Sequence, residues 1–219
     1  MSDAVRSPLA IAAMVSGQGR GSNVQSLLDA CESGEISARM AVVIGTRSDA
    51  MALERARSME VATAVVSPRK YENDETAYGE ILLGVLARHN VQLLCLAGYM
   101  RRLPYVIVSA YAGRIMNVHP ALLPLFGGRG MYGEHVHQAV LDSGMKVSGC
   151  TVHFVDEQYD TGPIILQTAV PVEEKDTPQT LAARILPCEH QTYVNAVRLF
   201  AAGCLRVDGR RVFTDANVE

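Results

Sequence analysis

The first half of the chain alternates short, uninterrupted apolar runs with longer amphipathic stretches. Apolar runs that lack polar alternation are typical of strands buried on both faces of a sheet. The pattern predicts strands at residues 9–15, 40–44, 62–66, 93–97 and 115–118. We expect these strands to form the centre of one sheet.

The stretches between these runs have the spacing of amphipathic helices. They predict helices at residues 22–31, 49–59 and 78–89, the second with Asp49 as its N-cap. Strands that are joined by helices of this length imply right-handed crossovers and parallel pairing. The expected fold class is therefore α/β, a doubly wound, mostly parallel, Rossmann-like sheet.

The pattern changes after roughly residue 130, where short apolar runs give way to alternation. Polar and apolar residues alternate over 147–155, and a further strand at 164–170 follows a turn at Gly162-Pro163. This arrangement is typical of antiparallel strands, which would extend the sheet at its C-terminal end.

The last part of the chain predicts a long helix and a hairpin. Thr177 supplies a cap and Pro178 a first-turn proline, so the helix should begin there. Pro187 should kink or break it, because proline cannot donate a helical hydrogen bond. Residues 204–213, around Asp208-Gly209, predict a small hairpin.

Composition limits the class of protein. The 219 residues suit one domain over 9–201, with the hairpin and tail at 202–219 either part of that domain or flexible. A net charge of -3 gives no electrostatic case for nucleic acid or an anionic membrane. No apolar run approaches the roughly 20 residues that span a bilayer. Five scattered cysteines without a CxxC pair favour a reducing, cytoplasmic location.

A glycine-rich turn at residues 16–23 follows the first strand and opens the first helix. Glycines let the main chain approach an anion, and helix N-terminal amides bind phosphate. The turn does not fit GxGxxG, because Ser22 occupies the last position, and no acidic residue follows the second strand. This disfavours a nicotinamide cofactor. A small-substrate monophosphate fits better, held by the backbone N–H groups of Gly21, Ser22 and Asn23; a tight connection that binds nothing is the alternative.

Asn117 and His119 are two residues apart at the end of a predicted strand, so their side chains point to the same side. An amide that donates to an oxyanion and an imidazole that transfers protons can therefore meet at one atom. Asp160, in a turn before Gly162-Pro163, could orient and charge that imidazole. These residue types suggest acyl-group transfer without a metal or covalent intermediate, although each residue alone is more typical of a structural role.

Four motifs together resemble those of the glycinamide ribonucleotide formyltransferases, a folate-dependent family of purine synthesis. They are Ser-Gly…Gly-Ser-Asn at 16–23, Leu-Ala-Gly-Tyr-Met-Arg at 96–101, Asn-Val-His-Pro-Ala-Leu-Leu-Pro at 117–124, and Asp-Thr-Gly-Pro at 160–163. The resemblance covers nearly the whole chain. It implies transfer of the formyl group of 10-formyltetrahydrofolate to the amine of glycinamide ribonucleotide, with no metal required.

The resemblance also implies residue roles. Asn117 and protonated His119 would stabilise the negative charge on the formyl oxygen, and His119 would carry the proton to the departing N10. Asp160 would raise the pKa of His119. Glu189 would contact the ribonucleotide, unless it is an exposed helix carboxylate. The folate would meet a wall and a closing loop made of Leu96, Met100, Arg101, Arg102, Leu103, Val108, Asp156 and Glu157.

The chain departs from the family pattern at several places. The first turn is longer and brings Arg20, and the loop 126–133 is longer and brings Arg129; both arginines are candidates for the substrate phosphate. Leu186-Pro187 stands where a polar substrate contact is expected. Only Arg69 or Lys70 are candidates for the folate glutamate tail.

Other interpretations stay open. His135 and His137 are two apart at a helix start, so they share no helical face and make a poor metal site; His153 is expected to be structural. The nearest alternative function is a formyltetrahydrofolate hydrolase, followed by a methionyl-tRNA formyltransferase and a nucleotide-binding regulatory module. The sequence leaves a homodimer open.

Overall fold

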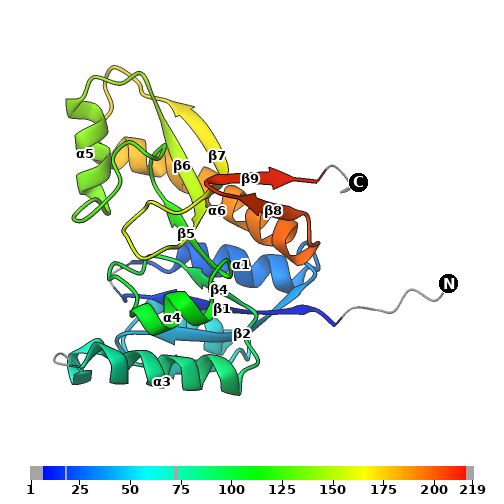
Figure 1. The fold of residues 1–219 in the computed structure, drawn as a ribbon. Coiled ribbons are helices and arrows are strands. Elements are labelled where there is room, and N and C mark those ends of the chain that lie inside the picture. The colour runs from blue at the N-terminus through cyan, green and yellow to red at the C-terminus, as the bar shows by residue number, and fades with distance from the viewer. Residues whose placement is uncertain (1–6, 18, 72–73, 216–219) are drawn as a thin grey trace.

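The structure is a computed structural model that describes residues 7–17, 19–71 and 74–215. One nine-stranded sheet with the order β3-β2-β1-β4-β5-β6-β7-β9-β8 runs through the molecule (Figure 1). Its strands are β1 (Leu9–Val15), β2 (Ala38–Gly45), β3 (Thr63–Val65), β4 (Leu93–Leu96), β5 (Ile115–His119), β6 (Val147–Phe154), β7 (Ile164–Pro171), β8 (Leu205–Asp208) and β9 (Arg211–Thr214). The helices are α1 (Ser22–Glu32), α2 (Met51–Ser58), η1 (Pro68–Tyr71), α3 (Glu75–Arg88), α4 (Tyr105–Ala110), α5 (Glu134–Asp142) and α6 (Pro178–Ala201).

The first five strands pair in parallel, as the apolar runs predict. Successive residues of β1 alternate between two cores: Ile11 and Ala13 pack beneath α1, α2 and α6, whereas Ala12 and Met14 pack beneath α3 and α4. A strand covered on both faces needs apolar residues at every position. The doubly wound fold class is therefore confirmed.

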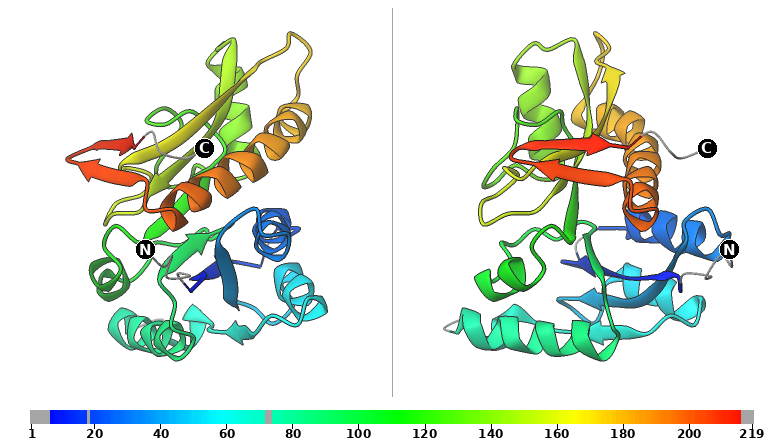
Figure 2. Two further views of the ribbon diagram at one scale, coloured as in Figure 1. Left: turned by 90° about the vertical axis from the view of Figure 1, so that its right-hand side faces the viewer. Right: turned by 45° about the vertical axis from the view of Figure 1, so that its right-hand side comes forward.

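The C-terminal strands are antiparallel, again as predicted. β6 pairs with β5 and β7 pairs with β6 in antiparallel register, and the β8–β9 hairpin adds to the sheet through β9. The hairpin lies at the end of the sheet away from α3 (Figures 1 and 2). It is thus joined to the sheet by hydrogen bonds.

Two expected helix features are wrong. Asp49 does not cap α2: Ala50 is the N-cap, and Asp49 instead pairs with Arg47 across 2.6 Å. A basic side chain two residues away competes with the helix amides for the carboxylate. The third helix begins at Glu75, because Asp74 accepts a hydrogen bond from the Ala77 amide and caps it there.

The long helix α6 continues through Pro187 to Ala201, so the expected break is absent. A proline inside a helix costs about 3 kcal/mol. Buried Leu181 and Ile185 before it and Tyr193 after it anchor the helix. The Tyr193 hydroxyl also lies 3.0 Å from the carbonyls of Leu96 in β4 and Met116 in β5. Packing on both sides of Pro187 offsets its local cost.

Within the described residues, no helix combines the length and apolar character needed to cross a bilayer.

Candidate active site

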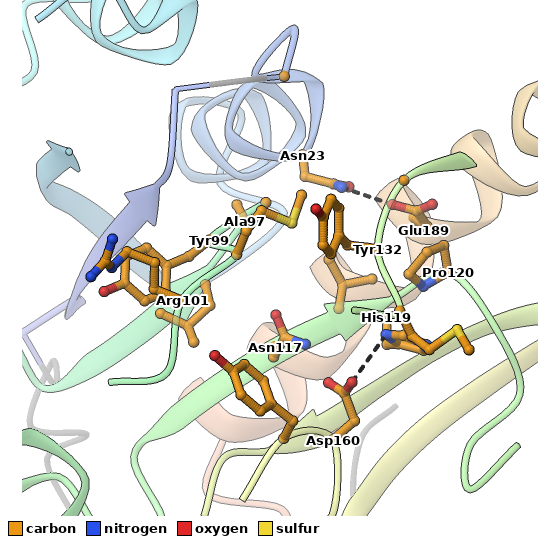
Figure 3. Close-up of a pocket in the computed structure, with 18 of the residues that line it drawn as sticks. Asn23, Ala97, Tyr99, Arg101, Asn117, His119, Pro120, Tyr132, Asp160 and Glu189 are labelled. Carbon is orange, nitrogen blue, oxygen red and sulfur yellow. Dashed lines mark hydrogen bonds and ion pairs between the residues drawn. The ribbon is translucent and has the colours of Figure 1, made fainter. Parts of the chain in front are cut away.

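A pocket of about 1050 Å³ lies at the carboxyl ends of β1, β4 and β5. Here the strand order reverses, since β1 lies between β2 and β4, and such points are the usual ligand sites of doubly wound sheets. Its walls come from residues 19–23, 96–103, 117–120, 128–134, 153, 155–156 and 158–160 and from one face of α6 (Figure 3). The motifs that the sequence singled out therefore border one cavity.

Asn117 and His119 both border the pocket from the end of β5, as their spacing predicts. His119 is 3% exposed, and its Nδ1 lies 3.6 Å from Oδ2 of Asp160 (Figure 3). Its Nε2 lies 2.8 Å from the carbonyl oxygen of Phe126. Asp160 also accepts a hydrogen bond of 2.9 Å from the Gly128 amide. The structure thus brings the three candidate catalytic residues together.

Burial, rather than Asp160, decides the ionisation of His119. Burial lowers the pKa of His119 below its ordinary 6.5, against the opposing effects of the Asp160 carboxylate and the Phe126 carbonyl. Asp160 does raise this pKa, as expected, but the net shift is downward because desolvation penalises the imidazolium more strongly. Burial also raises the pKa of Asp160, but His153, His119 and the Gly128 amide together outweigh it and leave that pKa below 3.8. At neutral pH the pair is a neutral imidazole beside a carboxylate.

His153 takes part in the same cluster, which the sequence did not predict. Its ring is 1% exposed, and its Nε2 lies 3.2 Å from Nδ2 of Asn117 and 3.6 Å from Oδ1 of Asp160. Its Nδ1 lies 2.7 Å from the carbonyl of Phe154, which can only accept, so Nδ1 carries the hydrogen. In the neutral ring Nε2 then accepts from Asn117, which fixes how the amide points. One amide hydrogen of Asn117 is engaged and the other is available to a substrate oxygen.

The place of His153 in the site follows from the pairing of β5 with β6. Asn117 is the register partner of His153 in that antiparallel pair, so their side chains lie on the same face. Alternation along residues 147–155 predicts the strand, but the register across the pair cannot be obtained from either strand alone.

The N-terminus of α1 forms the other end of the pocket. Gly21 is the N-cap in the left-handed conformation, with φ of 68°, and a Cβ there would lie 2.9 Å from the main chain of Ala52. Only glycine fits, so the amides that follow it stay open to the pocket. The first-turn N–H groups at Ser22 and Asn23 have no partner within the helix, as in any α-helix. This is the arrangement that binds phosphate.

Asn23 and Glu189 meet beside this helix end. Nδ2 of Asn23 donates a hydrogen bond of 2.8 Å to the Glu189 carboxylate (Figure 3). Oδ1 of Asn23 is buried and has no hydrogen-bond partner among the residues that the structure describes. Burial raises the pKa of Glu189, and the bond from Asn23 opposes that effect. Asn23 and Glu189 thus form a polar cluster with free hydrogen-bonding capacity beside the N-terminus of α1.

Comparisons with known proteins agree with this geometry. Residues 9–197 match the family model described as formyl transferase. The chain belongs to the formyl transferase family. A chloroplastic phosphoribosylglycinamide formyltransferase of Arabidopsis thaliana is 42% identical over 179 residues, 82% of this chain. The chain spans only 61% of that plant protein's length.

Two bacterial relatives match over almost their full length. The phosphoribosylglycinamide formyltransferase of Escherichia coli K12 is 36% identical over 197 residues, 90% of each chain. The crystal structure of glycinamide ribonucleotide transformylase 1 from Symbiobacterium toebii superposes with a TM-score of 0.88 at 46% identity, and the match covers 94% of this chain and 93% of that one. The nine-stranded arrangement is thus that of the formyl transferase family.

The residues expected to surround the folate divide into two groups. Those that border the pocket are Leu96, Met100, Arg101, Arg102, Leu103 and Asp156. The structure does not bring Val108 and Glu157 there. Val108 lies on the face of α4 that packs into the core beneath α3, and Glu157 is an exposed residue of the loop after β6. The sequence predicts the segments, but not which way each side chain faces.

Of the residues that depart from the formyl transferase pattern, some border the pocket and others do not. Arg20, Arg129 and Leu186 border the pocket, whereas Arg69 and Lys70 lie on the exposed side of η1 and do not. Arg20 and Arg129 are therefore among the arginines that line the cavity, together with Arg101 and Arg102.

The two neighbouring histidines in the first turn of α5 differ in their exposure. His137 is 4% exposed and borders the pocket, whereas the exposed His135 does not. Burial lowers the pKa of His137. Over the described part of the chain, no group of three or more His, Cys, Asp or Glu side chains is arranged to hold a metal ion.

Proposed function

We propose that this chain transfers the formyl group of 10-formyltetrahydrofolate to the amine of glycinamide ribonucleotide, N1-(5-phospho-D-ribosyl)glycinamide, in de novo purine (IMP) biosynthesis. One observation carries the proposal. A single pocket joins the open N-terminus of α1, which suits a phosphate, to Asn117, His119 and Asp160, which suit acyl transfer. The names of the relatives support formyl transfer to this ribonucleotide.

The phosphorylated amine fits the part of the pocket nearest α1. The amides at Gly21, Ser22 and Asn23 would hold its phosphate, with Arg20 and Arg129 adding positive charge. Glu189 would accept hydrogen bonds from ribose hydroxyls, because its carboxyl group borders the pocket and is already ordered by Asn23. This end positions the amine toward His119.

The folate fits the opposite wall, between β4 and the loop after β6. Leu96, Met100 and Leu103 supply apolar contact for a pterin, and the main chain there offers hydrogen bonds for its edge. Arg101 and Arg102 give positive charge beside the outer part of the molecule. Asp156, held by the Thr161 hydroxyl at 2.7 Å, orders the loop that would close over the ligand.

The reaction follows from the protonation states. The amine nitrogen attacks the formyl carbon, and the carbonyl electrons move to oxygen, where the Asn117 amide donates a hydrogen bond. Neutral His119 accepts the proton that the amine loses, and the adjacent Asp160 carboxylate stabilises the imidazolium that forms. The bond to N10 then breaks with its electron pair, and His119 returns the proton to N10. Burial of His119 therefore suits it to act first as a base.

The hydrolase alternative uses water in place of the amine. Such an enzyme has no need of an open helix terminus next to an ordered carboxylate. Because this chain has both beside the catalytic residues, the amine acceptor is favoured. A homodimer and a cytoplasmic location stay predictions.

The test is product identification. The purified chain is incubated with 10-formyltetrahydrofolate and glycinamide ribonucleotide, and the products are separated by mass spectrometry. The proposal expects the formylated ribonucleotide and tetrahydrofolate in equal amounts. Absence of the formylated product, with either substrate still bound, would reject it.

A further inference from the structure

The main chain of Phe126–Gly128 contacts both members of the catalytic pair. The Phe126 carbonyl lies 2.8 Å from Nε2 of His119, and the Gly128 amide donates to Oδ2 of Asp160 at 2.9 Å. That same Oδ2 lies 3.6 Å from Nδ1 of His119. Three consecutive residues of the loop after β5 thus connect the imidazole to the carboxylate without using a side chain.

The contact at Phe126 decides which nitrogen of His119 titrates. A carbonyl oxygen only accepts hydrogen bonds, so Nε2 carries a hydrogen whether the ring is neutral or charged. The nitrogen that gains and loses a proton is then Nδ1, which faces Asp160. In the opposite tautomer two lone pairs, on Nε2 and on the carbonyl, would face each other at 2.8 Å.

We propose that the main chain of Phe126–Gly128 is a positioning element that fixes His119 as the Nε2–H tautomer and holds Asp160 opposite Nδ1, so that Nδ1 accepts the proton of the attacking amine. The catalytic part of this statement rests on the proposed function. The amine nitrogen forms its bond to the formyl carbon, the carbon–N10 bond breaks with its electron pair on N10, and the proton passes from the amine through Nδ1 to N10.

Gly127 is the residue that lets this loop approach the pair. A Cβ there would lie 2.7 Å from Cδ2 of Leu123 and 3.1 Å from Cβ of Asp160. Its φ lies outside the left-handed region, so alanine is tolerated by the backbone and tests space alone. A methyl group at this position must displace the loop, Leu123 or Asp160.

The first test needs no variant. The full chain is labelled with ¹⁵N-histidine, and imidazole ¹H–¹⁵N correlation spectra are recorded from pH 5 to pH 8, with the His119 signals identified by their loss in His119→Asn. The proposal expects the neutral ring in the Nε2–H form, with Nδ1 titrating. Neutral His119 in the Nδ1–H form would overturn it.

The second test uses Gly127→Ala beside Gly84→Ala. Gly84 lies in α3, a Cβ there meets nothing within 4 Å, and its φ is also unexceptional, so it is a matched control. For Gly127→Ala we expect a mixture of tautomers and a kcat lower by about 10²-fold, the order expected for a displacement of ~1 Å, with KM little changed. Gly84→Ala should keep both the wild-type tautomer and the wild-type kcat.

The outcomes separate this inference from the proposed function. If Gly127→Ala keeps both the tautomer and full kcat, the loop does not position the pair. If the wild-type chain shows the Nε2–H tautomer but forms no formylated ribonucleotide, the positioning stands and the proposed function fails. If transfer proceeds with a wild-type Nδ1–H tautomer, the function stands and the positioning fails.

Discussion

His119 shows how an environment can reverse the effect of a neighbouring charge. The family resemblance implied that Asp160 would keep the imidazole protonated, yet burial lowers its pKa below 6.5. The spacing of Asn117 and His119 predicts that they share a face, because alternate strand residues always do. Burial depends on elements distant in sequence, such as the loop after β6 that carries Asp160, so its effect on ionisation could not be predicted.

Replacement of His119 should remove most of the activity. His119→Ala takes away the imidazole that borders the pocket 3.6 Å from Asp160 and that the proposed reaction uses to move a proton, and we expect kcat to fall by about 10²–10⁴-fold. Steady-state formyl transfer measures this. His89→Ala, at the end of α3 and outside the pocket, is the control. A near-normal kcat for His119→Ala would contradict the assigned role.

Replacement of His153 should act through Asn117. His153→Ala removes the acceptor that fixes the amide, and loss of a net hydrogen bond of ~1 kcal/mol corresponds to a decrease in kcat of roughly fivefold, with little change in KM. His153→Gln, whose amide oxygen can accept from Asn117, should keep more activity than alanine. Equal activity of both variants and wild type would show that Asn117 needs no partner.

At the scale of elements, the apolar runs predict the parallel strands well, since each is buried on both faces. The short helix α4 was not predicted, because six residues give too few turns for a clear period. For α5 only a helix start near His135 was expected, and the structure confirms it. Asp49 is a residue type that often caps helices, but here it pairs with Arg47. The residue type alone does not decide whether the carboxylate binds the helix amides or a neighbouring cation. The N-terminus of α1 was predicted from its glycines, and the structure adds the reason, the close approach to Ala52.

Closing that helix end should weaken binding of the phosphorylated substrate. Gly21→Ala places a Cβ 2.9 Å from Ala52 and should raise KM for glycinamide ribonucleotide roughly tenfold, as expected for a loss of ~1.4 kcal/mol of binding. Its strained φ should also cost about 1–3 kcal/mol of stability. Gly34→Ala is the matched control, because Gly34 also has positive φ but a Cβ there meets nothing within 4 Å. If KM changed equally in the two variants, the proposal that the N-terminus of α1 binds the substrate phosphate would be wrong.

At the scale of the whole molecule, the sequence predicts a doubly wound sheet with antiparallel C-terminal strands, and the structure confirms it. The local patterns specify each strand's environment but not the order β3-β2-β1-β4-β5, which depends on crossovers. The convergence of four distant motifs on one pocket follows from that order. Their joint resemblance to one family is what made the site predictable.

Stability of the whole chain should depend on buried histidines. Burial lowers the pKa values of His119, His137 and His190, so the unfolded chain binds more protons than the folded one below pH 6.5. Their contribution to the free energy of unfolding is full above pH 6.5 and decreases as the pH falls. Denaturant unfolding between pH 8 and pH 5 measures this decrease.

A single-residue variant isolates one part of this effect. His137→Asn should make the free energy of unfolding less dependent on pH, because it removes one of the three groups. His135→Asn, which removes an exposed ring two residues away, is the control. A free energy of unfolding that rises as the pH falls from 7 to 5.5 would contradict the assignment.

The most direct test of the central claim follows the fate of the formyl group. A single turnover is run with ¹³C-formyl-labelled 10-formyltetrahydrofolate. NMR then measures how much of the label is in the amide of the ribonucleotide product and how much is in free formate. We predict that nearly all label enters the amide when glycinamide ribonucleotide is present, and that turnover stops without it. Rapid release of labelled formate, whether or not the amine is present, would contradict the account.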